Sequence, residues 1–195
     1  MRPLPPPSLE VFTDRPDRRL VVLMSTPVAV VTQARYGPGQ PGASPHVHRR
    51  HADLFHVVEG GLEFLLGPNH SRHRLGPGQT VIAPPGVVHG FDLPASEAGW
   101  FLNVHAPGVE FDVYLRERGL IEDRALLDAK AARHDIYDEP ADGGLPEDRA
   151  VISSAGLVET WRRWAPPGED TETAAAVMRA ALELALSTPS GSPGV

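Results

Sequence analysis

The chain of 195 residues contains no cysteine. Disulfide bonds and thiolate ligands are therefore excluded, and any metal site must be built from nitrogen and oxygen donors. The sequence also lacks an apolar run near the ~18 residues that a membrane span requires. Its N-terminus has no apolar segment of the kind found in secretory signals. These absences predict a cytoplasmic protein that does not enter membranes.

Positive charge is scarce as well. The 18 Lys and Arg residues are outnumbered by 25 Asp and Glu, so the formal net charge is −7, and Lys130 is the single lysine. No basic cluster is larger than a pair such as Arg49-Arg50 or Arg162-Arg163. Nucleic-acid binding normally needs a basic stripe or patch. We therefore expect no nucleic-acid partner.

Glycine and proline are plentiful, at 19 and 21 residues, and they separate short apolar segments. Segments of this length at spacings of about ten residues are typical of an all-β sandwich or barrel. Gly60-Gly61 is a hairpin signal between two of them. The expected strands cover residues 20–24, 28–32, 54–59, 62–66, 79–83, 87–93 and 99–106, with a strand or loop at 70–75.

The composition changes along the chain and predicts four regions. Residues 1–16 form a Pro-rich N-terminal arm, residues 17–107 the barrel, residues 108–137 a helical extension, and residues 138–195 a loop, a C-terminal helix and a disordered tail. Apolar residues at helical spacing after Phe111 and after Ala125 predict two short helices, and the Ala/Leu-rich segment 173–186 predicts a longer one. Asp170 or Thr171 would cap this last helix. Residues 151–161 fit a strand or a loose segment.

The residues that carry chemistry are histidines and one acid. His46 and His48 are separated by one residue, so on a strand their side chains point the same way. Asp53 follows five positions later, and His89 follows the turn Pro84-Pro85-Gly86. Imidazole nitrogens with one carboxylate form the ligand sets of mononuclear iron, nickel, copper, manganese and zinc sites. The pattern therefore predicts a small metal cage.

These residues resemble the two motifs of the cupin superfamily, over about residues 40–106. The first motif is matched by His46-Val47-His48, four residues, Asp53, six residues and Gly60. The second is matched by Gly78, five residues, Pro84-Pro85-Gly86, two residues and His89. Two positions depart from the family pattern, because Asp53 stands where Glu is usual and Leu93 where Asn is usual.

The resemblance implies an all-β double-stranded β-helix, or jelly-roll, with short C-terminal helices. It also implies that His46, His48, Asp53 and His89 bind a divalent transition metal, which could be Fe, Ni, Mn, Cu or Zn. Asp53 is one methylene shorter than Glu, so it either coordinates directly or orients a histidine. The family often forms homodimers through its sheets and an exchanged N-terminal arm, and we expect a homodimer here.

In length and ligand order the chain is similar to small quercetinase-like cupins. This similarity implies a metal dioxygenase that acts on a small aromatic or hydroxy-ketone substrate, with Asp53 as the base. Two alternatives stay open. One is a redox-neutral metal-dependent isomerase, cyclase or lyase, and the other is a non-catalytic module that binds a small molecule.

The other histidines are assigned to less specific places. His51 is predicted to be a solvated loop residue. With Asp53 pointing inward, alternation along the strand places Phe55 and Val57 inward as well, and places Leu54, His56 and Val58 outward, so His56 is predicted to point away from the metal. His105 is placed on the outer face, because its neighbours Trp100, Leu102 and Val104 form the more apolar set. His70, His73 and His134 are expected to face solvent. Several apolar residues are expected in the core or on the wall of a pocket: Leu62, Phe64, Leu66, Val81 or Ile82, Phe91 and Trp100. Their number predicts an apolar cavity that binds a ligand.

Overall fold

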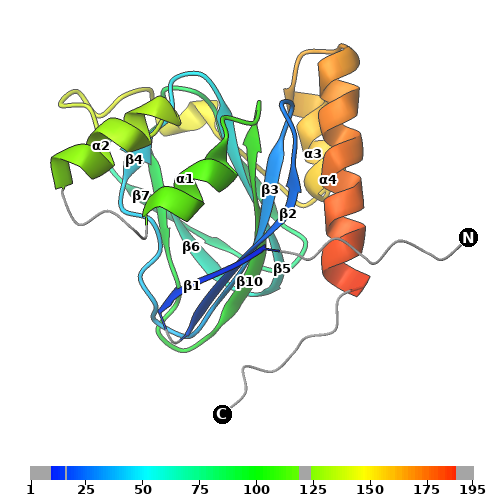
Figure 1. Ribbon diagram of the computed structural model, residues 1–195, viewed down its shortest axis with the longest axis horizontal. Coiled ribbons are helices and arrows are strands. Elements are labelled where there is room, and N and C mark those ends of the chain that lie inside the picture. The colour runs from blue at the N-terminus through cyan, green and yellow to red at the C-terminus, as the bar shows by residue number, and fades with distance from the viewer. Residues whose placement is uncertain (1–9, 16, 119–123, 188–195) are drawn as a thin grey trace, which may run out of the picture.

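The computed structural model describes residues 10–15, 17–118 and 124–187, and two antiparallel sheets face each other in it (Figure 1). The larger sheet runs in the order β1 (Glu10–Arg15), β2 (Arg18–Ser25), β3 (Val30–Tyr36), β10 (Gly99–Ala106), β5 (Ala52–Gly60), β8 (Thr80–Ala83) and β12 (Val151–Ser153). The smaller sheet runs β11 (Tyr137–Asp138), β4 (His46–Val47), β9 (His89–Asp92), β6 (Leu62–Leu66) and β7 (Ser71–Leu75). This is the predicted double-stranded β-helix.

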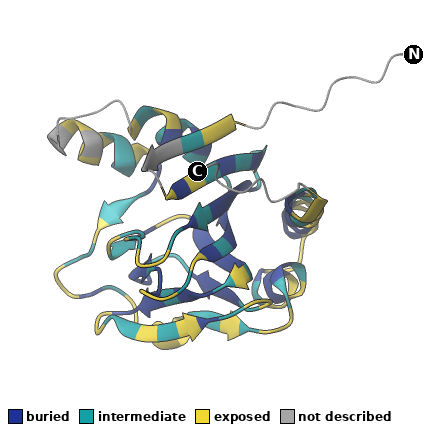
Figure 2. Cartoon of the chain, turned by 90° about the horizontal axis from the view of Figure 1, so that it is seen from below, coloured by how far each residue is buried: buried dark blue, intermediate teal, exposed yellow. Residues whose placement is uncertain are grey.

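Alternation along β5 divides the apolar residues into two clusters. Phe55 and Val57 belong to the cluster inside the barrel, with Leu62, Phe64, Leu66, Val81 and Phe91 among its members. Leu54 belongs to a second cluster on the outer face of the larger sheet. Buried residues therefore lie on both faces of the central strands, and these strands are largely dark blue in Figure 2. The predicted orientation of β5 is confirmed, whereas Trp100 packs against the outer cluster.

The outer cluster is covered by the C-terminal helices α3 (Leu157–Trp164) and α4 (Glu169–Ser187), which lie beside β2 and β3 in Figure 1. Four alanines and Met178 line the buried face of α4 and allow it to lie close to the sheet. The apolar face of this helix is thus used within the chain, and the homodimer stays a prediction. None of the described helices is long and apolar enough to cross a membrane.

The C-terminal elements differ from their predicted boundaries. Residues 151–161 are neither one strand nor a loose segment, because β12 ends at Ser153 and α3 begins at Leu157. The helix α4 begins at Glu169, so Asp170 and Thr171 lie in its first turn instead of capping it. The loop expected from residue 138 contains part of β11 and the 3-10 turn Glu147–Arg149. Residues 188–195 of the expected tail lie outside the described residues.

The expected N-terminal arm is also corrected. Residues 10–15 form β1, which pairs antiparallel with β2 and extends the larger sheet by one strand. This segment therefore belongs to the chain's own barrel, while residues 1–9 and 16 lie outside the described residues. The helical extension contains α1 (Phe111–Arg118) and α2 (Arg124–Arg133), as predicted. It ends in β11, which pairs with the ligand strand β4.

Candidate metal centre

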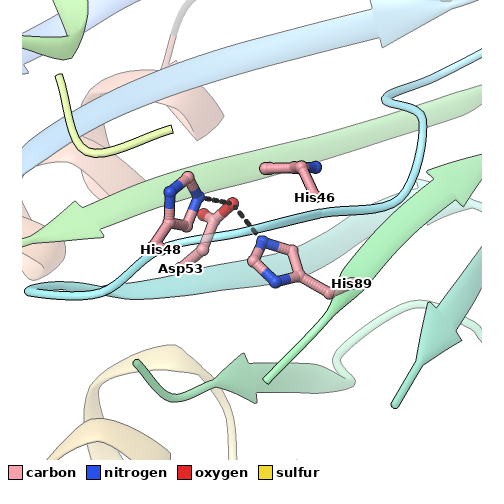
Figure 3. Close-up of side chains that lie close together, drawn as sticks. All are labelled: His46, His48, Asp53 and His89. Carbon is pink, nitrogen blue, oxygen red and sulfur yellow. Dashed lines mark hydrogen bonds and ion pairs between the residues drawn. The ribbon is translucent and has the colours of Figure 1, made fainter. Parts of the chain in front are cut away.

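Three strands from both sheets bring the four predicted site residues together (Figure 3). His46 and His48 stand on β4 and directly after it, and His46 pairs in register with His89 of β9. Asp53 projects from β5. One ligand atom from each of the four residues lies within 4.8 Å of the others. The shorter Asp side chain therefore reaches the three imidazoles without any displacement of its strand.

The three histidines are oriented by backbone carbonyl groups. A carbonyl oxygen only accepts hydrogen bonds, so the Nδ1 atom that contacts it must carry the proton. The Nε2 atom of each ring then has a free lone pair, which is the tautomer that a metal requires. The carbonyl partners are Ser44 for His46 (2.8 Å), Asp135 for His48 (2.7 Å) and Val87 for His89 (3.0 Å).

The lone pairs converge on one carboxylate oxygen. Asp53 Oδ2 lies 3.5 Å from His48 Nε2 and 3.2 Å from His89 Nε2. His48 Nε2 is buried and has no hydrogen-bond partner among the described residues. Several buried acceptors that face one another are costly unless a cation lies between them. The donor set thus fits a divalent transition metal held by three nitrogens and one oxygen.

The charge states at the site suit this assignment. Burial raises the pKa of the Asp53 carboxyl, but the imidazoles around it, His105 first, outweigh this effect and hold the pKa well below its usual range. Burial lowers the pKa of His46 well below its ordinary value. At neutral pH the site therefore holds a charged Asp53 carboxylate and a neutral His46 imidazole, the forms in which both groups bind metals.

Asn103 of β10 fixes the carboxylate of Asp53. Its side-chain amide donates a short hydrogen bond to Asp53 Oδ1 and a second one to the carbonyl of Leu54 (3.3 Å). These bonds leave Oδ2 turned toward the histidines. The sequence interpretation did not assign Asn103 a role. The available signal was its parity with Phe101, which faces the inner cluster.

His51 and His105 form a second group beside the first. His51 Nδ1 donates to the Asp135 carboxylate (2.8 Å), and its Nε2 lies 2.9 Å from His105 Nδ1. His105 Nε2 lies 3.0 Å from Asn103 Oδ1 and 3.8 Å from Asp53 Oδ1. Burial is the main cause that lowers the pKa of His51 to about 4. The group thus connects the loop after His48 with the carboxylate of the metal centre.

Both predictions for these histidines were wrong. His51 is fully buried instead of solvated. His105 faces the cavity, where its ring stacks on Phe111 at a centroid distance of 3.7 Å, instead of the outer face. The parity argument failed because α3 and α4 cover the outside of β10 and make that side the more apolar one.

The remaining histidines lie away from the cluster. His56 points out of it, as predicted, and is buried against Thr80, with 2.9 Å between His56 Nδ1 and Thr80 Oγ1. His134 was expected in solvent but is buried, and its Nδ1 donates to the carbonyl of Val109 (2.9 Å). His70 is partly exposed and contacts Glu139 at 2.8 Å. His73, which was expected to face solvent, is half-buried, and its Nε2 atom is buried without a hydrogen-bond partner in the part of the chain that the structure describes.

A cavity of about 490 Å³ opens beside the metal centre, between the barrel and the helical extension. His46, His48 and Asp53 lie on its wall, and so does the buried guanidinium of Arg18. Aromatic residues make up about half of the apolar lining, and a partly apolar cavity agrees with the one expected from the sequence. The aromatic residues are Tyr36, Phe55, Phe91, Phe101, Phe111, Tyr114 and Tyr137.

Residues 33–105 match the family model of the cupin domain. A solved protein with a double-stranded β-helix domain from Klebsiella pneumoniae is 33% identical, over 50% of this chain and 84% of its own, with a TM-score of 0.44. Residues 33–105 form a cupin domain. The match extends from β3 to β10 and includes all four residues of the metal centre.

Other solved structures are similar to about half of the chain. An RmlC-like cupin from Shewanella frigidimarina is 22% identical, over 53% of this chain and 88% of its own, with a TM-score of 0.47. The bacterial pirin YhhW from Escherichia coli, solved with nickel(II), is 16% identical, over 50% of this chain and 48% of its own, with a TM-score of 0.44. No curated protein matches the chain.

Proposed function

We propose that this cupin is a mononuclear metal-dependent enzyme that acts on a small aromatic or hydroxy-ketone substrate, with chemistry of the dioxygenase type. One observation carries the proposal: the three-histidine, one-aspartate cluster opens onto an aromatic-lined cavity of about 490 Å³. Cavities of this size enclose small organic molecules. Its aromatic rings can pack against a flat substrate and orient it toward the cluster.

The ligands in this proposal are His46, His48, His89 and Asp53, and the metal is iron, nickel, manganese, copper or zinc. Such a metal acts as a Lewis acid and as a template for the substrate. The backbone carbonyls behind the three histidines fix the ring tautomers. Asn103 fixes the carboxylate. The chain thus holds all four donors in place before any substrate enters.

Two roles are open to Asp53. The sequence interpretation assigned it the role of base as well as a ligand position. Its lowered pKa favours the ligand role, because a carboxylate that remains ionised is a weak base. His105 borders the same cavity, and burial lowers its pKa well below the ordinary value, so it stands there as a neutral imidazole that can accept a proton from the substrate.

The pair His51 and His105 also favours a second candidate, a redox-neutral isomerase, cyclase or lyase. Reactions of this type need a proton to be removed from one atom and returned to another, and a histidine at the cavity wall can do this. The 2.9 Å contact between the two rings and the anchoring of His51 on Asp135 keep His105 in one orientation. Dioxygen dependence separates the two candidates.

The first experiment is to measure the metal content of the protein as purified and after reconstitution with iron, nickel or zinc. We expect about one equivalent of metal, which is lost in His48→Ala and in His89→Ala and is retained in the surface control His70→Ala. Turnover that stops without oxygen supports the dioxygenase, and turnover that continues supports the redox-neutral enzyme. No metal uptake by the wild type would rule out both and leave a non-catalytic binding module.

A further inference from the structure

We propose that Asp135, which lies outside the barrel, is a positioning residue for the metal centre. It acts on two of the four ligands by separate routes, on His48 through its backbone carbonyl and on Asp53 through a series of side chains. This inference rests on the proposed metal site and concerns how that site is held.

Asp135 follows α2 and is fully buried. Its carboxylate accepts hydrogen bonds from the backbone N–H groups of Arg49 (3.1 Å) and Arg50 (2.7 Å) and from His51 Nδ1 (2.8 Å). The loop between His48 and Asp53 is thus wrapped around this single carboxylate. Burying a carboxylate is costly, and several charge-assisted hydrogen bonds offset that cost.

The first route leads to His48. The carbonyl oxygen of Asp135 accepts the hydrogen of His48 Nδ1 at 2.7 Å and so fixes the ring tautomer. Asp135 has a φ of 61°, a left-handed conformation that Asn and Asp tolerate better than most residues. Two residues later, Tyr137 pairs with Val47 in β11 and β4. The backbone on both sides of the His48 ring is therefore held by the segment that contains Asp135.

The second route leads to Asp53. From the Asp135 carboxylate the contacts run to His51, from His51 to His105 (2.9 Å), and from His105 to Asn103 (3.0 Å). Asn103 then donates to Asp53 Oδ1. All of these residues are buried. A displacement at Asp135 can thus reach the carboxylate ligand without passing through the metal.

Asp135 lies beyond the segment that matches the cupin domain, which ends at residue 105. The helical extension therefore completes the metal centre in addition to covering the cavity. The side chain of Asp135 must offer acceptor oxygens only, because the backbone N–H groups of Arg49 and Arg50 and the imidazole of His51 all donate to it. In Asp135→Asn, an NH₂ group replaces either Oδ1 or Oδ2, and in both places it faces the N–H of Arg49, which lies 3.2 Å from Oδ1 and 3.1 Å from Oδ2.

The test uses Co²⁺ alone as the probe. The metal-free full-length chain is titrated with Co²⁺, and the visible d–d spectrum and the dissociation constant are recorded for the wild type, Asp135→Asn and the control Glu117→Gln. Glu117 lies in the same extension and pairs with Lys130 at 2.7 Å, away from the centre. We expect Asp135→Asn to bind Co²⁺ about 10- to 100-fold more weakly with an altered spectrum, and the control to match the wild type.

Thermal unfolding of the metal-free proteins separates positioning from a purely structural role. A lower melting temperature for Asp135→Asn with an unchanged Co²⁺ affinity and spectrum would overturn the inference while the metal site stands. Absence of Co²⁺ uptake by the wild type would instead overturn the proposed function and this inference with it.

If Asp135→Asn does not fold, the variant His51→Phe provides the test, because it keeps a ring beside His48 but removes the second route. An unchanged spectrum and affinity in that variant would overturn the inference.

Discussion

Backbone carbonyls hold the three histidines of the candidate metal centre, so the orientations of their rings depend on the conformation of the chain more than on other side chains. Ser44, Val87 and Asp135 contribute these carbonyls. Because only the backbone carbonyl is used, the side chains of Ser44 and Val87 matter little for the orientation of the histidine rings. No residue type in the sequence therefore reveals this arrangement. Asp53 differs, because a side chain holds it, and its partner can be replaced by mutation.

Replacing Asn103 with Leu should weaken metal binding about tenfold, in keeping with the usual effect of losing a group that orients a ligand. The substitution removes the hydrogen bond to Asp53 Oδ1 and leaves the carboxylate free to turn from the cluster. Isothermal titration of the metal-free protein with Zn²⁺ measures the change. Asn69→Leu alters the same residue type at an exposed turn and should bind as the wild type does. Equal affinities for all three proteins would contradict the role of Asn103.

His56 gives a prediction for the pH dependence of stability. Burial lowers its pKa in the folded protein. Below about pH 6.5 the unfolded chain takes up a proton at this residue that the folded chain does not, so this group makes folding less favourable as the pH falls. The effect is absent above the unfolded pKa and is complete below the folded pKa.

In the metal-free protein, His56→Gln should therefore reduce the loss of stability between pH 7.5 and pH 5.5. Each pH unit in this window corresponds to at most about 1.4 kcal/mol for one proton. Urea denaturation of both proteins with a chelator present provides the unfolding free energies. A loss that is the same in the variant and the wild type would show that His56 takes up no proton on unfolding in this window.

At the scale of elements, the sequence predicts where the strands lie. It predicts the face on which each side chain lies correctly for β5 but not for β10. The parity of β5 could be predicted because Asp53 fixed one side as inward. The parity of β10 could not, because both of its faces are buried and its apolar residues lie under α3 and α4. The sequence pattern therefore placed His105, and with it Asn103 on the same face of the strand, on the outer side of the sheet. The position of Asp135 could not be predicted either, because an isolated acid after a helix carries no pattern that connects it with residues 48–53.

The packing of α4 on the barrel gives a further prediction. Met178 is fully buried in the outer cluster, and Met178→Ala should lower the unfolding free energy by about 2–5 kcal/mol through the cavity that it leaves. The control is Leu186→Ala on the same helix, because Leu186 is 59% exposed and its truncation should cost little. Chemical denaturation of the three proteins tests this. A small effect at Met178 would mean that α4 is not packed tightly against the sheet.

At the scale of the whole molecule, the metal centre connects the two sheets. Asp53 belongs to the larger sheet, whereas His46 and His89 belong to strands of the smaller one. A metal bound by these residues cross-links the two layers of the barrel in the folded state and has no preformed site in the unfolded chain. Metal binding should therefore stabilise the entire fold and not only the loop that carries His48.

Removal of the metal should lower the unfolding free energy of the wild type. A free metal concentration of 1,000 times the dissociation constant corresponds to about 4 kcal/mol. Thermal and urea unfolding with excess Zn²⁺, compared with a chelator, measures the difference. His89→Ala should lose almost all of the stabilisation by Zn²⁺. His70→Ala should keep it in full, because His70 lies outside the cluster. If Zn²⁺ stabilises His89→Ala as much as the wild type, the metal is bound elsewhere on the chain and does not link the two sheets.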